Sequence, residues 1–129
     1  MRKGFIMDLP PRFYDAMSLL NAGDYFECHE VLEELWREEP TSLRLFYQGI
    51  LQIAVGCYHL TVQHNRRGAL SKLQAGLDRL RQFPAVMHLV DVEDLRQQVE
   101  TLVEQVKAMT DEEIAAVERT PLLTVRYLT

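Results

Sequence analysis

The sequence contains little cysteine and no long run of apolar residues. Its two cysteines, Cys28 and Cys57, stand in no spacing typical of a metal or redox site, so we expect free thiols and a reducing compartment. No stretch is long and apolar enough to cross a bilayer, and residues 1–9 lack the apolar run of a signal peptide. We therefore expect a cytoplasmic protein without a membrane partner.

Basic residues are also scarce, because 14 Lys and Arg stand against 19 Asp and Glu, for a formal net charge of -5. Proteins that bind nucleic acid generally present a basic surface, so we expect no nucleic-acid partner. The charges are segregated, with acids concentrated in residues 21–39 and bases in residues 66–82. We interpret these segments as solvated faces that attract each other within a bundle or across a dimer, which leaves a homo-oligomer open.

The 129 residues are enough for one domain with its own hydrophobic core. Proline, glycine and capping residues divide the chain into helices. The expected helices lie at about residues 11–21, from 24 through 36 with an end before Pro40, at 43–64, 66–82 and 91–108, and in a short segment after Thr110. The expected capping residues are Asp24 with Glu27, Thr41, Asn65, Asp91, and Thr110 with Glu113. The best strand candidate, residues 124–128, reads as an extended tail that docks on the domain or on a neighbour. The prediction is an all-α fold, a single-domain bundle of five to six helices over residues 1–129.

Leucine and valine seams run along the two helices expected at 66–82 and 91–108. Their three-four spacing and the short link between them predict an antiparallel helical hairpin. One hypothesis for function is a protein-interaction or scaffold module that uses this hairpin, with Leu95 to Met109 as its apolar surface. The preceding helix is the most apolar, and Gly49 and Gly56 lie on one of its faces, where we expect another helix to approach closely.

Two polar strips stand out against these apolar faces. His29 and Glu33 are four residues apart at the edge of an apolar arc, so their side chains can meet. In the next helix, Gln48, Gln52, His59 and Gln63 fall within a stripe about 60° wide. An exposed stripe would normally carry Lys or Glu, so we favour a buried or cleft-lining stripe over plain surface.

The two strips meet if the helices form a hairpin around Pro40. Equal rise on both helices then places residue 29 level with about residue 51, and residue 33 level with about residue 47. His29 and Glu33 would lie near Gln48 and Gln52, with His59 one or two turns further along. The sequence therefore predicts a His/Glu/Gln polar cleft.

Such a cleft permits several chemistries. His29 could act as a catalytic base oriented by Glu33 while Gln48 and Gln52 hold a substrate, as in a hydrolase. His29 and Glu33, with Glu30 or His59, could also bind a divalent metal. The spacings of helical di-iron and zinc-protease motifs are missing, however. The alternative is a hydrogen-bonded network that locks the two helices together.

A candidate anion site lies at the start of the helix expected at 66–82. Asn65, Arg66, Arg67 and Gly68 bring basic side chains and free backbone N–H groups together. The alternative, which we favour, is an ordinary capped helix start with surface arginines.

The run from Tyr25 to Trp36 (YFECHEVLEELW) resembles the signature of domain-of-unknown-function family 309. The segment 47–54 (YQGILQIA), followed by Tyr58-His59 and by Asn65 with Gly68-Ala69, is similar to the rest of that signature. The resemblance covers about residues 13–80 and implies a small helical bundle. Residues 84–129 form a helical extension beyond it. The site residues that the resemblance implies are His29, Glu30, Glu33, Trp36, Gln48, Gln52 and His59. Because the family has no established activity, the reaction, if any, and the small-molecule ligand stay open.

Overall fold

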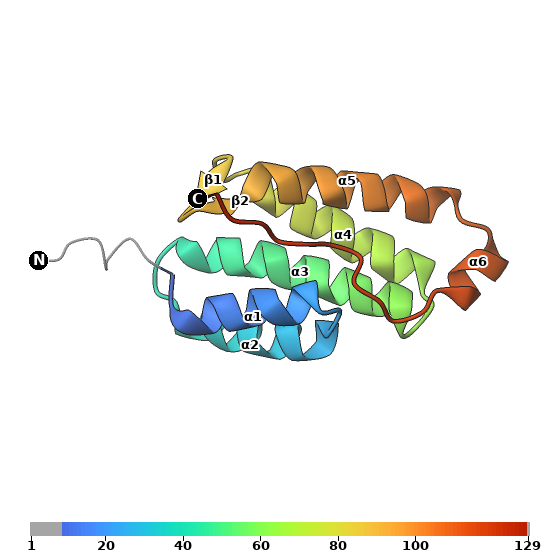
Figure 1. The fold of residues 1–129 in the computed structure, drawn as a ribbon, viewed down its shortest axis with the longest axis horizontal. Helices are drawn as coiled ribbons and strands as arrows, with labels where there is room; N and C mark the ends of the chain where they lie inside the picture. The colour runs from blue at the N-terminus through green and yellow to red at the C-terminus, as the bar shows by residue number, and fades with distance from the viewer. Residues whose placement is uncertain (1–8, 129) are drawn as a thin grey trace, which may run out of the picture.

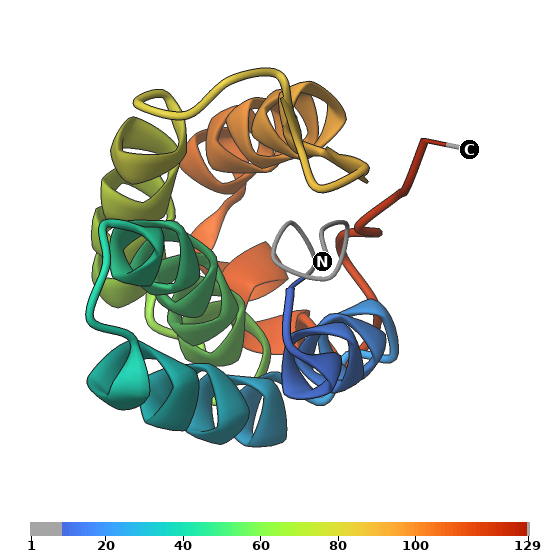
Figure 2. The same cartoon turned by 90° about the vertical axis from the view of Figure 1, so that its left-hand side faces the viewer.

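The computed structural model describes residues 9–128. The fold is all-α, as predicted, apart from one very short hairpin of strands. In order, the elements are α1 (Pro11–Asn21), α2 (Tyr25–Glu38), α3 (Leu43–Thr61), α4 (Arg66–Leu80), β1 (Val86–Met87), β2 (Val90–Asp91), α5 (Val92–Ala108) and α6 (Asp111–Ala116). Figure 1 shows the long helices lying roughly along one axis, and Figure 2 shows them curling from α1 and α2 through α3 and α4 to α5. The expectation about a signal peptide falls almost entirely outside the described residues.

Most helices begin where their capping residues predict. The side chains of Asn65 and Asp91 accept hydrogen bonds from backbone N–H groups of the first turn, and Thr110 forms the expected reciprocal capping box with Glu113. The capping box expected at Asp24 is wrong, because the Asp24 side chain makes no capping hydrogen bond. α2 ends at Glu38, before Pro40 as expected. The N-cap residue of α3 is Ser42 rather than the expected Thr41, and α3 ends at Thr61, before the expected end near His64.

α3 is the centre of the bundle and packs mainly against α4 and α2. Its inward face is fully buried, and includes Phe46, Ile50, Ile53 and Cys57. Glycines allow α4 to come close, as predicted for this face. A Cβ atom added to Gly56 would lie 2.8 Å from Leu73 Cγ, and one added to Gly76 would lie 2.6 Å from the Gly49 carbonyl oxygen. The α3–α4 contact is therefore partly one of backbone against backbone.

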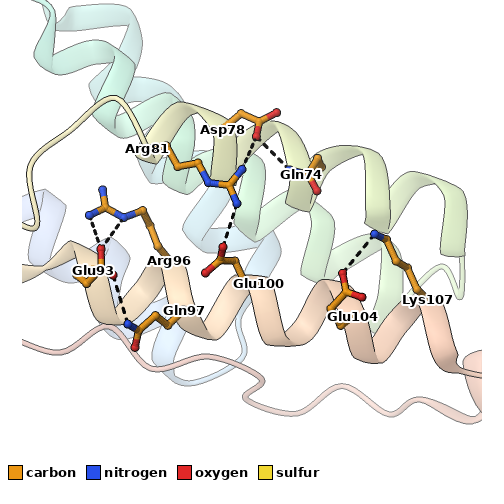
Figure 3. A network of polar contacts seen from close by, with 9 residues as sticks. All are labelled: Gln74, Asp78, Arg81, Glu93, Arg96, Gln97, Glu100, Glu104 and Lys107. Carbon is orange, nitrogen blue, oxygen red and sulfur yellow. Dashed lines mark hydrogen bonds and ion pairs between the residues drawn. The ribbon is translucent and has the colours of Figure 1, made fainter.

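The hairpin of α4 and α5 forms as predicted, but its seam is not a free surface. The seam side chains on α5 are at most 5% exposed; they are Val92, Leu95, Val99, Leu102 and Val106. They complete the hydrophobic core, so the proposed interaction surface is occupied within the chain itself. The outer faces of the two helices carry polar contacts instead (Figure 3). Among them, Arg81 joins Asp78 of α4 to Glu100 of α5 at 3.0 Å each.

The acids of α2 and the bases of α4 do form ion pairs within the bundle, but not with each other. Acids of α2 pair with Arg12 of α1, which contacts Glu34 and Glu38. Bases of α4 pair with residues of α4, α5 and α6 rather than with α2. In residues 9–128, no helix has both the length and the apolar character needed to span a membrane.

The C-terminal strap, residues 117–128, returns along the bundle from α6 toward the β1–β2 hairpin (Figure 1). It lies between α1 and α5: the Asn21 side chain exchanges two hydrogen bonds with the Val125 backbone, and Gln98 does the same with Thr124. Tyr127 adds a β-bridge to Val90. The predicted docking of the tail therefore takes place on its own domain.

Candidate ligand pocket between α2 and α3

His29 and Glu33 project from consecutive turns of α2, and both are only partly buried. The His29 Nε2 atom lies 3.7 Å from Glu33 Oε2, which is an ion-pair distance rather than a short hydrogen bond. The other carboxylate oxygen, Oε1, lies 3.0 Å from the Arg37 guanidinium. Glu33 is thus held more closely by Arg37 than by His29, which weakens its assignment as the residue that orients a catalytic histidine.

The two polar strips meet across α2 and α3, but about one helical turn away from the expected register. Glu33 shares a small pocket of about 170 Å³ with Trp36, Gln48 and Leu51, which we call the second pocket. His29 lies opposite Val55 rather than residue 51. The cause is the link between the helices: Glu39 is extended, with ψ of 115°, so the chain runs on past the end of α2 before α3 turns back.

This shift brings His59, expected one or two turns away, into the same pocket as His29. The pocket has a volume of about 210 Å³, and we call it the ligand pocket. Its walls come from α2 and from α3 with the residues just after it, and they are Tyr25, Phe26, His29, Val55, Tyr58, His59 and Gln63. Phe26 is 49% exposed at its edge, and its ring centroid lies 5.9 Å from that of His29 and 5.8 Å from that of Tyr58. Two imidazoles are therefore set among aromatic and aliphatic walls.

His59 is positioned by residues on both sides of the turn that leads to α4. Its Nδ1 atom contacts Gln63 Oε1, and because an amide oxygen only accepts, Nδ1 carries the proton of this hydrogen bond. The ring also lies against the first turn of α4, since a Cβ at Gly68 would be 3.0 Å from His59 Cγ. The remaining ring nitrogen, Nε2, is the one left for a ligand.

The remaining predicted cleft residues separate into different environments. Gln52 is half-buried, and its Oε1 atom is buried without a hydrogen-bond partner in residues 9–128. Trp36 packs against the core and lines the second pocket, with the Arg44 guanidinium carbon 4.6 Å from its ring centroid. Glu30 is exposed and lines neither pocket. The wall residues Phe26 and Tyr58 were not predicted as site residues, although each stands within three positions of a candidate histidine.

The candidate anion site at residues 65–68 is a capped helix start. The Asn65 side chain accepts from the Gly68 N–H at 3.0 Å. Arg66 donates to the Val106 carbonyl oxygen at 2.7 Å and pairs with Asp111 at 3.1 Å, so its guanidinium ties α4 to α5 and α6. Arg67 is exposed. The Asn65 cap is the one expected from the sequence, and anion binding beside it stays a prediction.

A metal centre has little support in the geometry. Across the part of the chain that the structure describes, no three His, Cys, Asp or Glu side chains gather as a metal site would require. His29 and Glu33 supply at most two ligands, and Arg37 competes for the carboxylate. The residues therefore do not form a set that we would assign to zinc or to a di-iron centre.

Residues 13–71 match the model of a protein family described as Domain of unknown function (DUF309). This segment is similar to that family and makes up slightly less than half of the chain. It contains every residue of both the ligand pocket and the second pocket, whereas α5, α6 and the C-terminal strap lie beyond the match. The chain is also 41% identical over 75 residues to the uncharacterized protein YpuF of Bacillus subtilis (strain 168). That alignment takes in 57% of this chain and 42% of the relative, so the chain spans less than half of the relative's length.

Proposed function

We propose that this protein binds a small organic molecule in the ligand pocket between α2 and α3. The observation that carries the proposal is that two histidines, 30 positions apart in the sequence, line one pocket whose other walls are mainly aromatic and aliphatic. Apolar walls with a few placed polar groups are characteristic of small-molecule sites. A structural network that merely locked α2 to α3 would fill this space with side chains instead.

The size of the pocket limits the ligand. Its volume of about 210 Å³ lies below the range of roughly 300–1,000 Å³ found for drug-sized ligands. The proposed ligand is therefore small, on the scale of a single ring with a short side chain. The partly exposed Phe26 lies at the edge of the pocket and would cover one side of such a ring.

The test is a fragment screen followed by two-dimensional NMR on isotope-labelled protein. The fragments are small acids, amides, alcohols and amines. We expect some of them to shift the signals of His29, His59 and Tyr58, and to lose this effect in Val55→Phe, which fills the pocket. The matched control is Leu51→Phe, one turn earlier on α3 in the second pocket, which should leave binding intact. The proposal fails if no fragment shifts these signals, or if Val55→Phe binds as well as the wild type.

We also propose a cytoplasmic location. The support is that Cys28 and Cys57 are free thiols in the structure, as expected for a reducing compartment. Fractionation of cells that produce the protein, with an immunoblot of each fraction, tests this location. Recovery in a secreted or membrane fraction would contradict it.

A further inference from the structure

We infer that the occupant of the ligand pocket is an organic monoanion, with a carboxylate at the His59 end and a flat apolar body against Phe26 and Tyr58. This inference rests on the proposed function and names the chemical class of its ligand. It follows from the charges around the pocket, from the position of His59 beside α4, and from the ring walls at the opposite side.

The charged and polar groups of the pocket favour an anion. The side chains that line it include two imidazoles and one amide but no carboxylate. The nearest acid to His29 is Glu33, at 3.7 Å, and this acid already pairs with Arg37. An ammonium group in the pocket would therefore lack an acidic partner among the lining residues, whereas a carboxylate would meet two imidazoles, which donate from their free ring nitrogens when protonated, and no lining charge of its own sign.

His59 is the better of the two histidines for holding the carboxylate. Its ring lies against the first turn of α4, where Gly68 leaves room for it. Unpaired N–H groups make a helix start electropositive, and the first turn of α4 contains no acidic side chain. Because Nδ1 is held by Gln63, Nε2 is the ring nitrogen left for the ligand, and it donates to a carboxylate oxygen when both ring nitrogens carry a proton.

The other end of the pocket suits an apolar ring. Phe26 and Tyr58 approach with their ring centroids 5.8 Å apart, and Val55 completes the wall. Offset or edge contacts between aromatic rings add to the burial of their surface. A single carboxylate matches two imidazole donors, whereas a phosphate dianion would need more donors than this pocket supplies.

The experiment compares three probes by NMR titration of the full chain: phenylacetate, its neutral isostere phenylacetamide, and inorganic phosphate. We expect phenylacetate to bind at least about tenfold more tightly than phenylacetamide, because a hydrogen bond to a charged group is stronger than one to a neutral group. In His59→Gln, phenylacetate and phenylacetamide should bind with about equal affinity. The preference for phenylacetate should persist in the control His88→Gln, which alters a histidine of the β1–β2 hairpin at the other end of the bundle (Figure 1).

The outcomes separate the two proposals. Equal binding of phenylacetate and phenylacetamide, or binding of inorganic phosphate as tight as that of phenylacetate, would overturn the anion inference and leave the ligand pocket standing. Failure of both ring probes, while other fragments bind at the pocket, would do the same. Failure of every fragment would overturn both proposals. If His59→Gln does not fold, the His59 ring signals of the wild type decide: they should move with phenylacetate and stay in place with phenylacetamide.

Discussion

His59 and Gly68 are in contact across the turn between α3 and α4, so that a methyl group at position 68 would lie 3.0 Å from both Cγ and Nδ1 of the His59 ring. It would also lie 2.6 Å from Nδ2 of Asn65, the residue that caps α4. The position of His59 in the ligand pocket therefore depends on the absence of a side chain at residue 68.

We predict that Gly68→Ala displaces His59 and weakens the cap at once. Alanine improves helix propensity by about 1 kcal/mol. Disturbing a side-chain cap costs about 0.5–2 kcal/mol, and forcing a neighbour aside costs about 1–3 kcal/mol. The free energy of unfolding should thus fall by about 0.5–4 kcal/mol, and the His59 ring signals in NMR spectra should shift. Arg67→Ala, an exposed change in the same turn, is the control, and unchanged His59 signals in Gly68→Ala would refute the dependence.

Gly49 and Gly76 test the close approach of α3 and α4. A Cβ at Gly76 would lie 2.6 Å from the Gly49 carbonyl oxygen and 2.7 Å from Ile53 Cγ1, so the two helices must separate. We expect Gly76→Ala to lower the free energy of unfolding by about 2–3 kcal/mol. In Gly49→Ala, the new methyl group meets only side-chain atoms of Arg79 and Leu80 at 3.1–3.3 Å, so the loss should be about 1 kcal/mol or less. Urea unfolding measures both, and equal losses would contradict the difference between backbone and side-chain contact.

The helices could be predicted because their signals are local. Asn65, Asp91 and Thr110 all make the capping hydrogen bonds expected from their positions. The leucine and valine side chains at three-four spacing are buried, as that spacing predicts. The β1–β2 hairpin was missed because its turn uses unusual residues. His88 and Leu89 adopt φ of 49° and 69°, where a hairpin normally has asparagine and glycine. Strands of only two residues are also too short to show the alternating pattern by which strands are predicted.

The lining of the ligand pocket was predicted only in part. The pattern within each helix shows which residues share a face, but it does not show which turn of α2 lies beside which turn of α3. The periodicity placed His29 and His59 on strips that face each other, but the path of the link at Glu39 decided which turns meet. Phe26 and Tyr58 look like ordinary core aromatics in the sequence. Their role as pocket walls follows from a tertiary contact, which no helical pattern contains.

Tyr25 connects the ligand pocket to the C-terminal strap. Its hydroxyl donates to the Thr120 carbonyl oxygen at 2.7 Å and accepts from the Leu122 N–H at 2.9 Å, while its ring lines the pocket. Tyr25→Phe removes both hydrogen bonds, so we expect faster amide hydrogen exchange in the strap and a loss of about 1–3 kcal/mol in the free energy of unfolding. Tyr14→Phe is the control, because the Tyr14 ring contacts Phe13 and Tyr127 of the strap, and phenylalanine keeps that ring. Equal exchange in the two variants would show that Tyr25 does not hold the strap.

Alkaline pH should destabilise the fold through buried groups that stay protonated. Burial raises the pKa of the Cys28 thiol from 9.0 to about 12; burial, with smaller contributions from Glu39 and Tyr14, raises the pKa of Tyr47 from 10.0 to about 12. Each group ionises at a lower pH in the unfolded chain than in the folded one, so the stabilisation that these two groups contribute is fully present below pH 9 and is lost as the pH rises from 9 toward 12.

The contribution of Cys28 can be isolated by its slope. One such group lowers the free energy of unfolding by up to about 1.4 kcal/mol per pH unit. Urea unfolding between pH 8 and pH 10.5 should therefore show a shallower pH dependence for Cys28→Ala than for the wild type, whatever the stability of the variant at pH 8. The comparison rests on the slope because removing the buried sulfur also leaves a small cavity, and that cost is the same at every pH. Identical slopes would mean that the thiol can reach water and ionise without unfolding, which would contradict its place in the core.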